Sequence, residues 1–185
     1  LGYFTFIPIL ALIIQVFNYG ITLAGVGFTI SALMIFLDGE KNNSTIDVLT
    51  GINNRRAFNI AINKMFNDSN TKMFLMLMDA NDFKKINDDY GHLVGDKALI
   101  EIAELLRKAI KGTGNNYFLG RFGGDEFIIM GKYINENSIE ELIKNIKQEE
   151  EYINKRDKAY RITMSIGYSI KNNSHLTVDN LIEEA

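Results

Sequence analysis

The chain has 185 residues and a formal net charge of -3, with no cysteine and two histidines. The lack of cysteine excludes a disulfide framework, a thiolate metal site and a cysteine nucleophile. The acidic balance argues against a protein that coats a nucleic acid with a dense basic face, but a single bound nucleotide remains compatible with it. Charge is unevenly placed, because no Asp, Glu, Lys or Arg occurs before Asp38.

The uncharged segment 1–37 predicts helices embedded in a membrane, since about 20 apolar residues span the hydrocarbon core of a bilayer. We expect the last span over about 19–37, preceded by the end of an earlier helix. A short polar linker over 38–46 either continues this helix or frays into a loop. The first basic residues follow the span, which places the remainder on the cytoplasmic side of the inner (cytoplasmic) membrane.

Four small residues share one face of the expected span, which lets another helix backbone approach closely. Two interpretations stay open: contact with other helices of the same bundle, or contact with a second copy of the chain. The four residues are Gly20, Ala24, Gly27 and Ser31.

Residues 47–185 alternate helical and strand-like patterns, which predicts one α/β domain with at least one antiparallel hairpin. Asn54 can cap a first helix. An unbroken apolar run predicts a buried central strand that ends at Asp79. In chain order we expect helices over 55–67, from 82 or 83, over 93–111, over 138–153 and from 177, and strands over 73–78, 117–122, 127–130 and 161–170.

Acidic residues lie where two of these strands meet. Gly123 and Gly124 predict a tight hairpin turn, because glycine accepts positive φ. Asp125 and Glu126 would stand at its tip, beside Asp79 at the end of a neighbouring strand. Three carboxylates at one sheet edge repel one another, so a cation is expected there. Hard oxygen ligands suit Mg²⁺, with Mn²⁺ as an alternative, and fit nucleotidyl transfer among several phosphate chemistries.

The soluble part resembles the GGDEF domain of diguanylate cyclases over 47–185. Five blocks match the family in order: Asp47 to Arg56, Asp79 to Asp88, Gly91 to Asp96, Arg121 to Phe127, and Thr163 to Gly167. The resemblance implies an α+β sandwich whose central, mostly antiparallel sheet is flanked by helices. It also implies condensation of two GTP molecules into cyclic di-GMP and two pyrophosphates, with a homodimer in which each domain presents one GTP.

The resemblance assigns catalytic and metal-binding roles. Asp79 and Asp125 would be metal ligands together with the carbonyl of Ala80. Asp125 would also accept the proton of the attacking 3′-hydroxyl, and Glu126 would complete the acidic catalytic site.

The resemblance also assigns substrate contacts. Asn87 and Asp96 would hydrogen-bond the guanine base, while the helix start at Asp82 and Phe83, together with Lys84, would contact the phosphates. Considered alone, the residues have simpler interpretations, such as a helix cap for Asp82 and compensation of a helix dipole for Asp96. Asp47 would form an ion pair with Arg55 and Arg56 in a structural entrance turn. The expected substrate-binding residues are Asn87, His92, Asp96, Asp82, Phe83 and Lys84.

Three features depart from the family. Asn81 stands where the family often has a second aspartate, and we expect activity to survive this change. The arginine and aspartate of the family's product-inhibition motif would fall at Gly114 and Tyr117, so we expect no inhibitory site. The last helix stops before the family's basic phosphate contacts, which predicts poor GTP binding by this chain.

Three functions remain as hypotheses. The leading one is a membrane-anchored diguanylate cyclase, and the second is a catalytically weak GGDEF domain that binds GTP or cyclic di-GMP and regulates a partner. The third is a relative that makes a mixed adenine-guanine product. Asp96 favours guanine, because a carboxylate accepts from the N1 and N2 donors of guanine.

Overall fold

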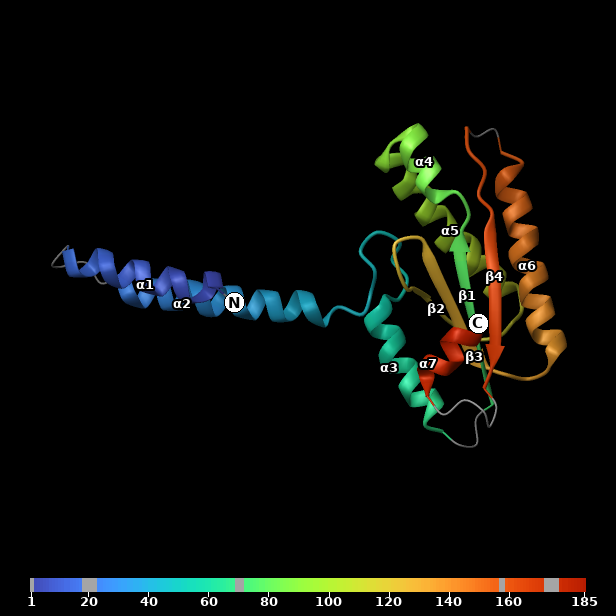
Figure 1. Ribbon diagram of the computed structural model, residues 1–185, viewed down its shortest axis with the longest axis horizontal. Helices are drawn as coiled ribbons and strands as arrows, with labels where there is room; N and C mark the ends of the chain where they lie inside the picture. Colours follow the sequence, from blue (N-terminus) through green and yellow to red (C-terminus); the bar gives the residue numbers. More distant parts are fainter. Residues whose placement is uncertain (1, 18–22, 69–71, 157–158, 172–176) are drawn as a thin grey trace. The chain divides into compact units, whose positions relative to one another are not determined.

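The computed structural model describes residues 2–17, 23–68, 72–156, 159–171 and 177–185. The chain forms two compact units, Leu1–Ser44 and Thr45–Ala185. The elements, labelled in Figure 1, are α1 (Gly2–Phe17), α2 (Leu23–Asn43), α3 (Arg55–Phe66), β1 (Met73–Ala80), α4 (Phe83–Tyr90), α5 (His92–Gly112), β2 (Phe118–Arg121), β3 (Glu126–Lys132), α6 (Glu136–Asn154), β4 (Met164–Ile170) and α7 (Val178–Glu184).

In the first unit, α1 and α2 pack closely against each other. A β-carbon added to Gly27 would lie 2.9 Å from Cβ of Ala11 and 3.3 Å from Cα of Pro8. Ser31, one turn further along α2, is also buried. The small-residue face is therefore used within the unit at Gly27 and Ser31, which favours the first interpretation of that face. Gly20 and the side chain of Ala24 lie outside the described residues.

The predicted membrane-spanning helix over 19–37 finds no support. Its first residues lie outside the described part of the chain, and α2 continues beyond its predicted end through the charged residues to Asn43. Helix α1 has only 16 residues. Within the described ranges, no helix combines the length and the apolar character needed to cross a membrane.

The second unit contains a four-stranded sheet of order β2-β3-β1-β4, in which all three pairings are antiparallel. This confirms the expected antiparallel sheet flanked by helices. β4 starts at Met164, three residues later than predicted. The reason is that the amide of Asn154 on α6 binds both the N–H and the carbonyl of Ile162, at 2.8 and 2.6 Å, in place of a neighbouring strand.

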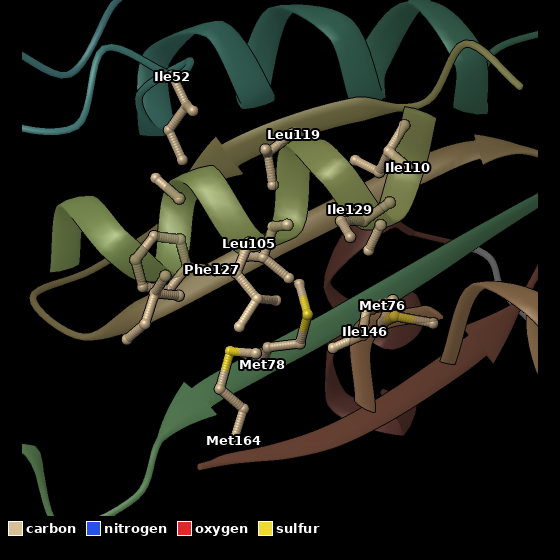
Figure 2. Close-up of a cluster of buried hydrophobic side chains, with 14 of the residues drawn as sticks. Ile52, Met76, Met78, Leu105, Ile110, Leu119, Phe127, Ile129, Ile146 and Met164 are labelled. Atoms are coloured by element: carbon tan, nitrogen blue, oxygen red, sulfur yellow. The ribbon is translucent and has the colours of Figure 1, made fainter. Parts of the chain in front are cut away.

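Both faces of the sheet are covered, α3 and α7 packing on one face and α5 and α6 on the other (Figure 1). Met73 to Met76 of β1 are completely buried, as the apolar run predicts. Figure 2 shows Leu105 of α5 gathered with Met78 and Phe127 of the sheet. The centres of β1 and β3 are therefore apolar, and the acidic residues of these two strands lie at one end of the sheet.

Candidate active site

The end of β1 meets the start of β3 at one edge of the sheet. Asp79 is paired with Glu126 in the antiparallel register. The N–H of Ala80 donates to the carbonyl of Asp125 at 3.2 Å. The structure thus brings the three predicted acidic residues to one edge, although Asp79 lies 46 positions before Asp125 in the sequence.

The charge of Asp125 acts on Asp79 at this edge. Burial, and then the negative charge of Asp125, raise the pKa of Asp79 above its ordinary value. Two carboxylates and the carbonyl of Ala80 are a donor set that suits Mg²⁺, which usually takes one or two carboxylates and completes its octahedron with water and phosphate oxygens. The residues present therefore fit the expected cation.

Glu126 does not join these aspartates in a tight cluster. Its carboxylate lies over Gly123, where an added β-carbon would collide with Oε2. Among the residues that the structure describes, no three His, Cys, Asp or Glu side chains are arranged to hold a metal ion. The backbones of the three predicted acidic residues therefore meet at one edge, as expected. Only the side chains of Asp79 and Asp125 remain as candidate metal ligands.

The hairpin turn is tight for a different reason from the predicted one. The N–H groups of Phe122 and Gly123 both donate to the carbonyl of Glu126, at 2.8 and 3.3 Å. Positive φ occurs at other glycines of the described chain, not at Gly123 or Gly124. At Gly123 the absence of a β-carbon leaves room for the Glu126 carboxylate in its present position.

Arg121 fixes the hairpin tip to the entrance turn of the domain. Its Nε and Nη2 donate to the carbonyl of Gly124, at 3.1 and 2.6 Å, and its Nη1 lies 3.2 Å from Oδ1 of Asp47. The backbone and hydroxyl of Thr50 donate to the same Asp47 oxygen. Burial alone would raise the pKa of Asp47, but the bonds from Thr50 and the charge of Arg121 outweigh it and lower that pKa.

The predicted ion pair of Asp47 with Arg55 and Arg56 is wrong in its partner, which is Arg121. Arg55 instead stacks over the ring of Phe122, 4.6 Å from the ring centre. The prediction used arginines close to Asp47 in sequence, whereas the observed partner, Arg121 on β2, lies 74 positions away.

The start of α4 has an unusual backbone. Asp82 occupies the N-cap position with φ of 57°, and it is the one described residue other than glycine with positive φ. Its side chain makes no capping hydrogen bond, so the simple interpretation as a helix cap is wrong in its chemistry. Left-handed backbone at a residue with a β-carbon costs about 1 kcal/mol or more, and such strain tends to occur at functional sites.

The predicted guanine contacts lie at the junction of α4 and α5. Gly91, with φ of 84°, joins the two helices. The side chains of Asn87 and Phe83 lie against Gly95, where an added β-carbon would collide with the Asn87 amide. Gly95 directly precedes Asp96 in α5, so the structure brings Asn87 and the Asp96 backbone together. Three further predicted residues are exposed nearby: Lys84, His92 and Asp96.

Asn81, just after β1, and two hydroxyls at the start of β4 were not assigned a role from the sequence. The N–H of Asn81 donates to the carbonyl of Thr163 at 2.9 Å, and its side chain binds the hydroxyls of Thr163 and Ser165. Ser165 is the β4 partner of Asp79. The match of the block from Thr163 to Gly167 was the available signal, but no residue pattern pointed to these bonds.

A cleft of about 450 Å³ opens beside this edge, lined among others by Asp79, Phe122, Glu126 and Ser165. A larger hollow of about 830 Å³ lies between α3 and β2, and it contains none of the acidic site residues. We place the site at the smaller cleft, because Asp79 and its register partner Glu126 both line it.

The two positions that would hold the family's inhibitory motif lie between α5 and β2. Gly114 has φ of 68°. Tyr117 is buried, with its ring centre 5.0 Å from that of Phe74.

A family model described as "Diguanylate cyclase, GGDEF domain" matches residues 44–185. The chain belongs to the GGDEF family. It is 36% identical over 97 residues to the diguanylate cyclase DgcP of Pseudomonas aeruginosa, a match that covers 51% of this chain and 14% of that protein. It is 32% identical over 101 residues to the cyclic di-GMP phosphodiesterase PdeR of Escherichia coli, over 54% of this chain and 15% of that protein.

Solved GGDEF proteins share the fold. The diguanylate cyclase SiaD of Pseudomonas aeruginosa, solved with its activator SiaC, aligns with a TM-score of 0.68 at 23% identity, over 88% of this chain and 64% of SiaD. This GGDEF chain thus spans a small part of the curated relatives, and less than two thirds of SiaD.

Proposed function

We propose that this GGDEF domain is the catalytic part of a diguanylate cyclase, which condenses two GTP molecules into cyclic di-GMP and two pyrophosphates. The observation that supports this most is the Asp79–Asp125 pair at the edge of the sheet, beside an intact Gly-Gly-Asp-Glu-Phe turn. Like charges placed this close are costly unless a cation binds them.

In the proposed reaction, the 3′-hydroxyl of one GTP attacks the α-phosphorus of the other, and pyrophosphate leaves. Asp125 accepts the proton of this hydroxyl. Asp79, Asp125 and the Ala80 carbonyl would hold Mg²⁺ or Mn²⁺, which when bound neutralises developing charge on the phosphate oxygens. A second, equivalent attack closes the ring, so each protomer of a homodimer presents one GTP to the other.

Guanine recognition belongs to the junction of α4 and α5. The side-chain amide of Asn87 and the carboxylate of Asp96 hydrogen-bond the base, with His92 beside it. The acceptor carboxylate selects guanine over adenine. The start of α4, with the N–H groups at Asp82 and Phe83, and the exposed Lys84 contact the phosphates.

A second function has support from one relative. PdeR is named a cyclic di-GMP phosphodiesterase, so a GGDEF-like sequence also occurs in a protein with another activity. A domain of that kind would bind GTP or cyclic di-GMP and regulate a partner without turnover.

Product analysis separates these functions. The protein is incubated with GTP, ATP and Mg²⁺ or Mn²⁺, and products are identified by mass spectrometry across a range of protein concentrations. Cyclic di-GMP, formed at a specific rate that rises with dimer content, is expected. Nucleotide binding without any cyclic dinucleotide would establish the regulatory function, and a mixed adenine-guanine product would overturn the guanine assignment.

We further propose that the N-terminal unit attaches the protein to the inner membrane, with the GGDEF domain in the cytoplasm. Support comes from large apolar side chains exposed on α1 and α2, including Phe17 at 81% and Phe28 at 58%. Flotation with liposomes tests this. The full chain is expected to float with the lipid, and a version beginning at Thr45 is expected to stay in the dense fraction; equal behaviour of the two would contradict the proposal.

A further inference from the structure

Three side chains form a row across the sheet at the proposed active edge. Glu126 of β3, Asp79 of β1 and Ser165 of β4 are directly paired in the antiparallel registers. Directly paired residues project from the same face of a sheet. All three line the same cleft, so a neutral hydroxyl stands beside the metal-binding aspartate.

The hydroxyl of Ser165 is held from one side. Its Oγ donates to Oδ1 of Asn81 at 2.7 Å, and Nδ2 of Asn81 donates to Oγ1 of Thr163 at 3.2 Å. The backbone N–H of Asn81 also donates to the Thr163 carbonyl. Asn81 is therefore tied to the start of β4 at three points, immediately after the last residue of β1.

This arrangement decides which part of the Ser165 hydroxyl is available. A serine hydroxyl has one proton to donate and two lone pairs that accept. Because the Ser165 hydroxyl already donates its hydrogen bond to Asn81, it cannot donate to the neighbouring Asp79. The lone pairs remain, and they form an acceptor at the cleft.

We propose that Asn81 is a positioning residue for the cyclase reaction: it orients the Ser165 hydroxyl so that its oxygen accepts a hydrogen bond from water bound to the cation at Asp79. This rests on the proposed function and adds a residue outside the acidic set. Partners that orient the shell of a metal site typically change metal affinity or activity by about 10–100-fold when removed. Here the Asn81–Ser165 hydrogen bond would play this orienting role.

The test is a titration of the full chain with Mn²⁺ alone, followed by electron paramagnetic resonance of the free ion. Ser165→Ala and Asn81→Leu are each expected to weaken Mn²⁺ binding about tenfold. The double variant should bind no more weakly than either single one, because both remove the same oriented oxygen. Asn81→Asp keeps an acceptor for Ser165 and should retain wild-type affinity or exceed it.

Thr163→Val is the matched control. It removes the other bond of the Asn81 amide and leaves the Ser165 bond in place, so its Mn²⁺ affinity should stay within about twofold of wild type. The melting temperature of every variant shows whether the fold persists. In the cyclase assay, Ser165→Ala and Asn81→Leu should lower kcat more than they raise KM for GTP.

Two results would overturn the proposal. One is Asn81→Leu with a lower melting temperature but unchanged Mn²⁺ affinity and kcat, which would make the tie purely structural. The other is equal weakening of Mn²⁺ binding by Thr163→Val and Ser165→Ala. Failure of the proposed function looks different: the predicted order of Mn²⁺ affinities would hold while no cyclic dinucleotide forms.

Discussion

Strand β1 passes through two environments within eight residues. Its first half, Met73 to Met76, is completely buried between two helical layers, whereas Asp79 near its end is exposed at the sheet edge. The first half stabilises the fold by removing apolar surface from water. At the end, partial loss of water contact and a neighbouring carboxylate oppose the charge of Asp79. Stability and chemistry are therefore separated along one strand, and variants of each region should affect one and spare the other.

Replacement of Asp125 should have the largest effect on chemistry. Asp125→Ala removes a metal ligand and the proposed proton acceptor, so turnover should fall by about 10³-fold or more. The free energy of unfolding should change by less than about 0.5 kcal/mol, because a carboxylate that repels its neighbour stabilises little. Initial rates of cyclic di-GMP formation and urea unfolding measure the two quantities.

The exposed Glu104→Ala on α5 is the control for this variant, and it should leave both quantities unchanged. A fold that collapses on Asp125→Ala would mean that the edge contributes to stability after all, and the separation would not hold.

Replacement of Leu105 should have the largest effect on stability. Leu105 on α5 is completely buried against the sheet (Figure 2), so Leu105→Ala should cost about 2–5 kcal/mol through lost burial and a cavity. Leu93 lies in the first turn of the same helix and is 80% exposed, so Leu93→Ala should cost less than about 0.5 kcal/mol. Denaturant midpoints test both, and similar costs for the two leucines would contradict the described core.

Most of the fold follows from apolar periodicity. The run from Met73 to Met78 predicted the central strand, and the spacing of apolar residues placed α3, α5 and α6 within two residues of their observed ends. The start of β4 was missed because Asn154 replaces a strand neighbour at Ile162, a contact between side chain and backbone that has no periodic signal.

The site was only partly predictable. Asp79, Asp125 and Glu126 could be placed at one edge because each stands at the end of an expected strand. The position of the Glu126 side chain over Gly123 depends on its rotamer, which sequence does not specify. The bond of Arg121 to Asp47 and the bond of Asn81 to Ser165 join residues more than 70 positions apart, so they depend on the completed sheet register.

Arg121 holds both the hairpin turn and the entrance turn, so its loss should lower turnover and stability to an intermediate degree. Arg121→Ala breaks the bonds to the Gly124 carbonyl and to Asp47, and leaves a carboxylate without its cation. We expect a loss of about 1–2 kcal/mol in unfolding free energy and about tenfold in turnover, since a loosened turn misplaces Asp125. Arg107→Ala, which removes one bond to the Gly51 carbonyl, should lower stability without lowering the turnover of folded protein. Equal turnover in the two variants would show that the turn keeps its geometry without Arg121.

The smallest expected effect is on the pH dependence of stability, which should run in opposite directions for Asp79 and Asp47. The raised pKa of Asp79 means that its ionised form opposes folding, a penalty that disappears as pH falls through the folded-state pKa. Asp79→Asn should therefore stabilise the protein at pH 7, by less than about 1 kcal/mol because the group is exposed and screened.

Asp47 should behave in the opposite way. Its lowered pKa means that the ionised form favours folding above the unfolded-state pKa, and this contribution is lost as pH falls through the lower folded-state pKa. Asp47→Asn should therefore destabilise the protein at pH 7, and the difference should vanish in acid. Unfolding midpoints of both variants between about pH 3 and pH 7 give the comparison. Asp47 has a cationic partner, Arg121, whereas Asp79 has an anionic neighbour, Asp125. If both substitutions changed stability in the same direction at pH 7, Asp79 would already have a compensating charge. A bound cation at the sheet edge would then have no electrostatic reason.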